Sequence, residues 1–171
     1  MTLVTLDSAR IFDTRRPQMG MFERAVWARW WEQWGGEWDR VGLNVPLYDP
    51  YLARSRRGRA GGNDSLPEPL WRVDAVIGRE LSVCLVEVKV VANMTAIGQL
   101  HSYRWLFPQC YHGFGELQVL LVGERIPPVI RAVAEAGGIS WSEVGSLDRW
   151  ELRGGGRSRI RVKDRVLAQG G

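Results

Sequence analysis

The chain has 171 residues, a length that suits one domain, and its formal net charge of +4 accompanies 45% hydrophobic and 25% charged residues. Its apolar stretches are too short to cross a membrane, and its N-terminal residues lack the apolar centre of a secretory signal. Two cysteines, Cys84 and Cys110, cannot build a disulfide framework or a four-cysteine metal site, so we expect a cytoplasmic protein with no membrane partner.

The N-terminal part predicts a helix over residues 19–34, followed by a strand over residues 38–48. Apolar residues recur at helical spacing in the first of these ranges, at Met19, Phe22, Val26 and Trp30. The glycines at 35 and 36 stop the helix. Its tryptophans are most simply explained by packing in the core, and base stacking is the alternative.

A long Gly-, Pro- and Arg-rich loop is expected over residues 50–69. Two strands should follow, over residues 70–77 and 81–91, joined by a tight connection around Gly78. The next helix should cover residues 93–107, with Asn93 or Thr95 as its cap and Pro108 as its end.

The remaining elements alternate between strand and helix. We expect a strand at 117–122, a helix from 127 or 128 to 136, a strand at 139–144, and an edge strand or hairpin arm at 158–167. This order predicts one α/β domain with a mixed sheet flanked by helices, with its core at about 19–145 and a basic C-terminal arm at 153–171.

The apolar run LVEVKV, residues 85–90, contains an acid and a base. Side chains of a strand alternate between its faces, so Glu87 and Lys89 should share one face while the valines line the other. The preceding strand has an acid of its own, Asp74, which a hairpin would bring beside Glu87.

Two carboxylates in an apolar setting repel each other and are costly to desolvate. A divalent cation removes this conflict, and oxygen ligands suit Mg²⁺ or Mn²⁺. A lysine beside the metal can orient or deprotonate a water and stabilise developing charge. Lys89 is one of only two lysines among 23 basic residues, and its ammonium has a tunable pKa that a guanidinium lacks.

Asp74, twelve intervening residues and then Glu87-Val88-Lys89 resemble the motif of the PD-(D/E)XK nuclease superfamily, which has the restriction-endonuclease-like fold. The proline that precedes the aspartate in that motif is absent, because Arg72 and Val73 stand there. The resemblance implies that Asp74 and Glu87 hold the metal, with the Val88 carbonyl as a further ligand, and that Lys89 acts on the attacking water.

Two further stretches resemble branches of the same superfamily. Gln99 and Tyr103 form a Q-x-x-x-Y motif on one helix face, similar to that of RecB-type nucleases and archaeal mismatch endonucleases, where the pair positions DNA and the metal site. Gly20, Glu23 and Arg24 match the G-x-x-x-E-R opening of archaeal Holliday-junction resolvases only in part, with two residues rather than three before the glutamate. That resemblance implies that Glu23 contributes to metal binding.

Each motif also has an alternative explanation without a catalytic role. Glu23 could be an ordinary helix-surface acid, Gln99 and Tyr103 the rim and core of an amphipathic helix, and the Asp74 group merely structural. His101 and His112 are interpreted as surface or packing residues. Cys84 is expected in the core, and because no other cysteine lies nearby in the sequence, we do not expect the iron–sulfur cluster of some members of this superfamily.

Together these patterns predict a Mg²⁺- or Mn²⁺-dependent deoxyribonuclease, expected to be an endonuclease of junction or repair type, with an exonuclease as the competitor. The rival class is an inactive nucleic-acid-binding or assembly protein that keeps the fold. Basic residues expected to contact DNA phosphates lie in the loop and in the arm: Arg54, Arg56, Arg57, Arg59, Arg157, Arg159 and Arg161. Solvated surface charge is the alternative for these. We also expect a homodimer, with the Trp-rich first helix as its interface.

Overall fold

The computed structural model describes residues 6–7, 19–49 and 69–145. Its centre is a five-stranded sheet of order β2-β3-β4-β6-β7. The strands are β2 (Arg40–Leu47), β3 (Trp71–Arg79), β4 (Ser82–Val91), β6 (Glu116–Arg125) and β7 (Ser140–Glu143). The first three pair antiparallel with one another and the last three pair parallel, so the sheet is mixed.

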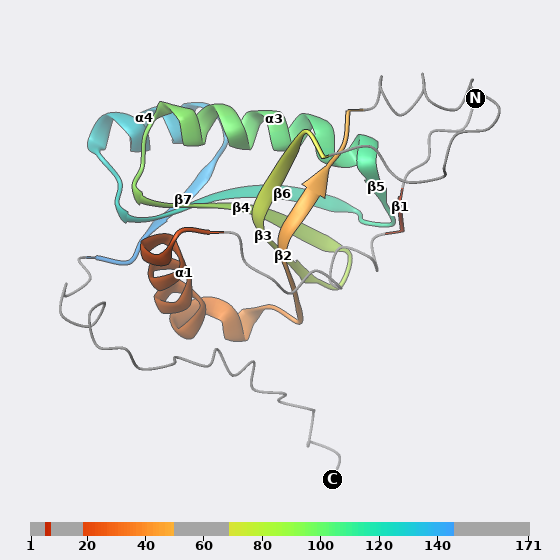
Figure 1. The fold of residues 1–171 in the computed structure, drawn as a ribbon, viewed down its shortest axis with the longest axis horizontal. Coiled ribbons are helices and arrows are strands. Elements are labelled where there is room, and N and C mark those ends of the chain that lie inside the picture. Colours follow the sequence, from red (N-terminus) through yellow and green to blue (C-terminus); the bar gives the residue numbers. More distant parts are fainter. Residues whose placement is uncertain (1–5, 8–18, 50–68, 146–171) are drawn as a thin grey trace, which may run out of the picture.

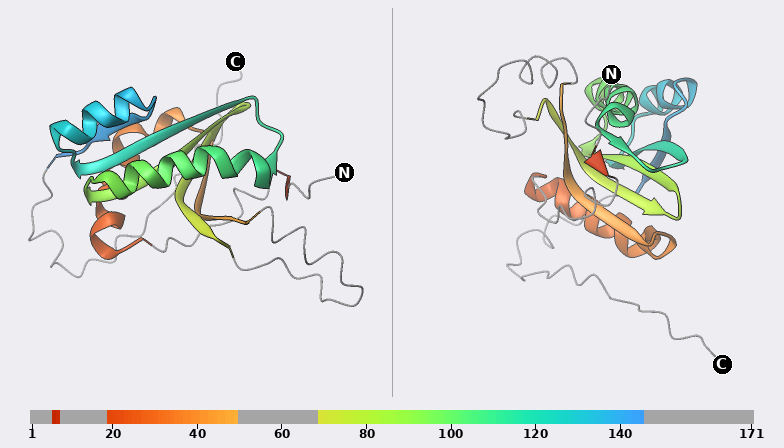
Figure 2. Two further views of the ribbon diagram at one scale, coloured as in Figure 1. Left: turned by 90° about the horizontal axis from the view of Figure 1, so that it is seen from above. Right: turned by 90° about the vertical axis from the view of Figure 1, so that its right-hand side faces the viewer.

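Helices cover both faces of this sheet (Figure 1). Helix α1 (Met21–Trp34), extended by the 3₁₀ turn η2 (Gly35–Glu37), lies below the sheet in that view. Helices α3 (Met94–Cys110) and α4 (Pro128–Ala136) lie above it, and Figure 2 shows the same division from two other sides. A short parallel pair of β1 (Leu6–Asp7) and β5 (Tyr111–His112) completes the described elements. The predicted α/β class is therefore confirmed.

Alternation along β4 produces the two halves of the core. Leu85 packs in the cluster on the side of α3, while Val86 and Val88 pack with Trp27 and Trp30 of α1. Each such apolar side chain contributes roughly 1.5–3 kcal/mol when it is fully buried. The core interpretation of the α1 tryptophans is confirmed for Trp27 and Trp30, whose rings stack 5.4 Å apart.

Two predicted element ends differ from the structure. Of the predicted connection Gly78-Arg79-Glu80, the first two residues belong to β3, with Gly78 paired to Val83, and the chain reverses at the last, Glu80, which has a φ of 52°. Helix α3 does not stop before Pro108 but continues to Cys110. A proline removes one hydrogen-bond donor, and burial of Phe107 and Cys110 against the core offsets that loss near the helix end.

At the other end of α3, Asn93 is the cap, because its side chain accepts a hydrogen bond from the backbone N–H of Ala96 at 3.1 Å. Thr95, the other candidate cap, lies within the helix. Three predicted segments lie outside the described residues: the loop at 50–68, the basic arm at 153–171 and the strand at 158–167. In the described part of the chain, no helix is long and apolar enough to cross a membrane.

Candidate active site

The site begins where β3 and β4 separate. Their paired positions run from Arg79 and Ser82 to Ala75 and Val86, and Asp74 follows directly on β3. The Asp74 Oδ2 accepts a hydrogen bond from the backbone N–H of Val88 at 2.9 Å. A side chain thus links the strands at the point where their regular pairing ends, and this places Asp74 beside the segment that carries Glu87.

Glu87 is the one charged side chain buried in the described residues, with 1% of its surface exposed. Lys89 Nζ donates to Glu87 Oε1 at 2.5 Å, and Tyr103 Oη donates to Glu87 Oε2 at 3.1 Å. Both carboxylate oxygens therefore have partners, as a buried charge requires.

Lys89 also connects β4 to the start of α1. Its Nζ lies 3.6 Å from Glu23 Oε1, and the two side chains are 22% and 28% exposed. The other Glu23 oxygen accepts from the backbone N–H of Gly20 at 3.0 Å, which satisfies one free donor at the helix start. Glu23 is thus both a capping residue and a neighbour of the lysine, and not simply a surface acid.

The Q-x-x-x-Y pair reaches the same group from α3. Gln99 Nε2 donates to Tyr103 Oη at 3.2 Å, and the hydroxyl lies 3.1 Å from both Glu87 Oε2 and the Arg72 carbonyl. A phenol has one proton to donate, and a bond to the carboxylate is the stronger of the two choices. Tyr103 therefore ties α3 to Glu87 and to the beginning of β3.

Burial and like charge dominate the electrostatics of the carboxylates. Burial raises the pKa of Asp74. Burial, and next the charge of Asp74, raise the pKa of Glu87 to about 7, although Lys89 and Tyr103 oppose this change. Burial alone would lower the pKa of Lys89, but the charges of the surrounding carboxylates, Glu87 first, raise it overall. Three carboxylates around one ammonium give this group an excess of two negative charges when all are ionised.

The donor chemistry suits a divalent cation of the magnesium type. Asp74 and Glu87 offer two carboxylates. Val88, which follows Glu87 and donates its N–H to Asp74, has a main-chain carbonyl. Mg²⁺ takes such oxygen ligands together with waters. Within the described ranges no cluster of three or more His, Cys, Asp or Glu residues is arranged to hold a metal. The residues that the resemblance assigns to the metal are Asp74, Glu87, the Val88 carbonyl and Glu23, and of these Glu23 contacts Lys89 in this structure.

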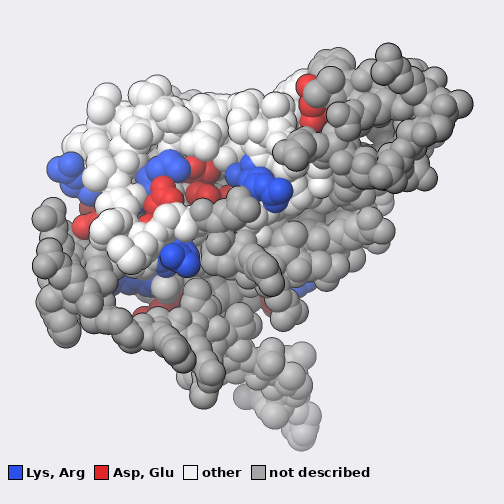
Figure 3. All heavy atoms as spheres, in the orientation of Figure 1, with Lys and Arg blue, Asp and Glu red and all other residues white. Residues whose placement is uncertain are grey.

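The structure brings six of the predicted site residues into one connected network: Glu23, Asp74, Glu87, Lys89, Gln99 and Tyr103. On the face of the molecule drawn in Figure 3, acidic and basic side chains gather in a band below an upper surface of mostly uncharged residues. The predicted DNA-contacting arginines lie outside the described residues. Sequence reasoning missed the carbonyl of Arg72 as a partner of Tyr103, because every residue type carries a carbonyl and no side-chain pattern marks it.

The raised pKa of Glu87 predicts a pH dependence of stability in metal-free protein. An acid whose pKa is about 7 when folded and 4.5 when unfolded binds more protons in the folded state between these values. The free energy of unfolding should therefore fall as pH rises through this window, by at most about 3 kcal/mol. Asp74, whose pKa is also raised, acts in the same direction.

Denaturant unfolding in chelator at a series of pH values measures this effect. Glu87→Gln should flatten the curve in the same window, while Glu32→Gln, at an exposed position of α1, should leave it unchanged. Stability that is constant or rises between pH about 5 and about 7 in the unsubstituted protein would contradict the account.

Comparisons with known proteins add little to this geometry. No family model and no curated protein matches the chain. One matching solved structure is the crystal structure of the protein of unknown function AF1548, at 13% sequence identity and a TM-score of 0.42. The match covers 78% of this chain and 64% of the other, so this chain spans less than two thirds of that protein's length. A likeness at this level carries no argument about fold or function, and the case for function depends on the residues of the site.

Proposed function

We propose that the protein is a metal-dependent deoxyribonuclease, acting as an endonuclease on DNA phosphodiester bonds. The observation that carries the proposal is the buried Glu87 carboxylate, held between Lys89 and Tyr103 and next to Asp74. Burying this group is costly, and a purely structural strand would gain as much from an apolar residue there. The resemblance of these residues to the PD-(D/E)XK motif gives the cost a catalytic explanation.

In this proposal Asp74, Glu87 and the Val88 carbonyl would hold Mg²⁺ or Mn²⁺. When bound, such an ion stabilises negative charge that develops on phosphate oxygens during hydrolysis. Tyr103, itself fixed by Gln99, keeps Glu87 in one orientation through the bond to Oε2. Glu23 is the second carboxylate in contact with the lysine, and it comes from α1.

In this proposal Lys89 acts on the water that attacks the phosphate. Its raised pKa in the metal-free protein keeps Nζ protonated, so it starts as a positive charge that can orient a water and attract a phosphate. It becomes able to accept a proton only when the carboxylates that raise its pKa are engaged elsewhere. We therefore assign orientation and charge stabilisation, rather than proton abstraction, as the first task of this residue, which contacts the carboxylates of Glu87 and Glu23.

The test is cleavage of a panel of linear, branched, mismatched and single-stranded DNA with Mg²⁺, repeated with excess chelator. The proposal expects cleavage that requires the metal, and Ca²⁺ should support binding with poor turnover because its coordination is looser. DNA binding without cleavage of any substrate would favour the rival, a binding or assembly protein.

The four arginines of residues 50–69 have a predicted role in binding phosphates. Replacing Arg54, Arg56, Arg57 and Arg59 with Ala should weaken binding to all DNA sequences alike. The dependence of log affinity on log salt should flatten by roughly 0.9 for each phosphate that is no longer neutralised. Titrations at several salt concentrations measure the slope, and an unchanged slope would mean that these arginines do not contact DNA.

The proposal also includes a homodimer in the cytoplasm, since cutting both strands requires two sites. Trp27 and Trp30 are buried in the core, so they are not the interface, and Met21 and Phe22 are the exposed apolar residues at the start of α1, at 56% and 49%. Sedimentation at working concentration decides the point: a monomer active on duplex DNA would refute the dimer.

A further inference from the structure

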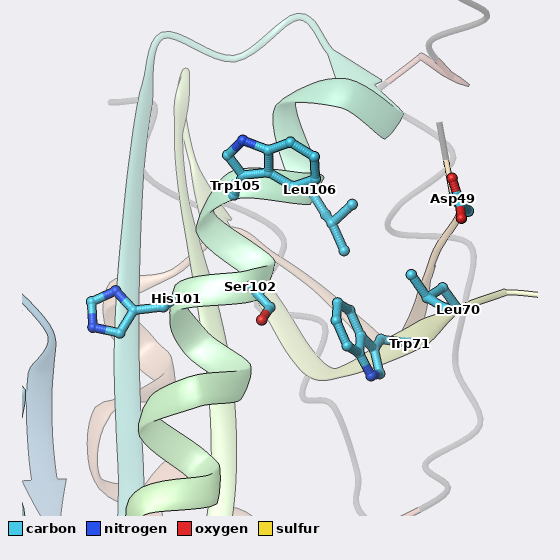
Figure 4. Close-up of a pocket in the computed structure, with 7 residues that line it drawn as sticks. All are labelled: Asp49, Leu70, Trp71, His101, Ser102, Trp105 and Leu106. Atoms are coloured by element: carbon cyan, nitrogen blue, oxygen red, sulfur yellow. The ribbon is translucent and has the colours of Figure 1, made fainter. Parts of the chain in front are cut away.

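An open cavity of about 450 Å³ lies between α3 and the start of β3, beside the candidate active site (Figure 4). Leu70 and Trp71 form one side of it, and Ser102, Trp105 and Leu106 of α3 form the other. Its size is within the range of small-ligand sites, about 300–1,000 Å³.

The lining exposes apolar and aromatic surface to solvent. Leu70 is 48% exposed, Trp71 41% and Trp105 57%. Large apolar side chains gathered around a hollow commonly mark a binding surface, and indole rings offer flat faces on which other rings can stack.

On both walls of the cavity, a lining residue is the chain neighbour of a residue that takes part in the active-site network. Trp71 precedes Arg72 on β3, and Ser102 precedes Tyr103 on α3. The Arg72 carbonyl and the Tyr103 hydroxyl lie 3.1 Å apart, and the same hydroxyl bonds Glu87. Trp71 is three residues from Asp74, which is about 10 Å along a strand. The backbone of both walls is therefore adjacent to the network, and the cavity is within the length of a few nucleotides of the active site.

Charge decides which part of a nucleic acid the cavity suits. Its ionisable lining groups are Asp49 and His101, and the negative charge of a carboxylate disfavours a phosphate inside the cavity. Asp49 and Leu70 also flank the sequence span 50–69, in which four arginines outnumber the acids Asp64 and Glu68. A strand whose base enters the cavity would keep its phosphates outside it, and the sequence between Asp49 and Leu70 carries a net positive charge that favours phosphates.

We propose that this cavity takes an unpaired nucleobase of the DNA substrate, stacked against Trp105 and Trp71. The inference deepens the proposed nuclease function and rests on it for the position of the strand. It assigns the substrate class as DNA with unpaired bases next to the cleaved phosphate, such as a flap, a junction or a mismatch, in preference to fully paired duplex. Stacking tolerates any base, because every base has an aromatic face.

Binding of labelled DNA to the full chain in chelator tests the cavity apart from cleavage. Two substrates share the same duplex and the same phosphates, and one carries unpaired bases where the other carries abasic residues. The unsubstituted protein should prefer the first by about 5- to 150-fold, the effect of one stacked base. Trp105→Ala and Trp71→Ala should each reduce this preference strongly, and Trp105→Phe should restore most of it.

Trp34→Ala is the matched control, since Trp34 is 41% exposed at the end of α1 on the opposite face of the sheet, and it should keep the full preference. Equal affinity of the unsubstituted protein for the two substrates would overturn the inference. So would a preference that survives both Trp71→Ala and Trp105→Ala. Metal-dependent cleavage without the preference would support the nuclease proposal and contradict the base-binding role of the cavity. The preference without any cleavage would support the base-binding role and contradict the nuclease proposal.

Discussion

Replacing Lys89 with Met is expected to slow single-turnover cleavage of DNA by about 100-fold or more while DNA affinity stays close to that of the unsubstituted protein. Lys89 Nζ is the one positive charge that contacts both Glu87 and Glu23 among the described residues. Methionine keeps the length of the side chain but can neither orient a water nor carry a proton. The loss should therefore fall on the chemical step and not on binding.

Arg79→Met is the control for this substitution, because it removes a positive charge from the exposed far end of β3. It should leave the cleavage rate unchanged. Thermal melting of both variants shows whether they fold; Glu87, whose pKa is about 7, can take up a proton when its lysine partner is removed. A folded Lys89→Met variant that cleaves as fast as the unsubstituted protein would make the lysine structural.

Replacing Glu87 with Gln is expected to reduce cleavage for a different reason, the loss of metal binding. The substitution keeps the shape of the side chain but removes one of two carboxylate ligands, so the affinity for Mg²⁺ or Mn²⁺ measured by calorimetry should fall by about 10-fold or more. Excess Mn²⁺ should restore part of the cleavage activity. Thermal stability without metal should rise above pH about 7, since repulsion with Asp74 is gone.

The exposed Glu32 provides the comparison here as well, and Glu32→Gln should bind metal as the unsubstituted protein does. Two results would count against the assignment of Glu87. One is unchanged metal affinity in Glu87→Gln, and the other is a variant that binds metal more weakly but still cleaves DNA as fast as the unsubstituted protein at limiting Mg²⁺.

The sequence predicted the centre of the site because strand geometry is local. Alternation along β4 placed Glu87 and Lys89 on one face, and the hairpin placed Asp74 beside them, as their hydrogen bonds show. The four-residue spacing on α3 likewise brought Gln99 and Tyr103 together. The roles inferred for these residues remain predictions, because contacts alone do not demonstrate chemistry.

Other features depended on tertiary contacts that no short pattern encodes. Helix α3 continues beyond Pro108 to Cys110, which is packed in the core. The residue with a left-handed backbone conformation in the β3–β4 turn is Glu80 and not Gly78. The cavity beside the site is formed by Trp71 and Trp105, which are distant in sequence and follow no motif. Burial of Trp27 and Trp30 against the sheet left a smaller apolar surface on α1 than the sequence suggested for a dimer interface.

The most direct test of the proposed nuclease is the single-turnover cleavage rate of labelled DNA in Mg²⁺, measured for the unsubstituted protein and for Asp74→Asn purified in parallel. Asp74 is a metal ligand in the proposal, and it accepts the Val88 N–H in the structure, a bond that asparagine can keep through its own oxygen. The account predicts cleavage that stops in chelator and falls about 100-fold or more in Asp74→Asn. Cleavage at equal rates by both proteins, or cleavage that continues in excess chelator, would contradict it.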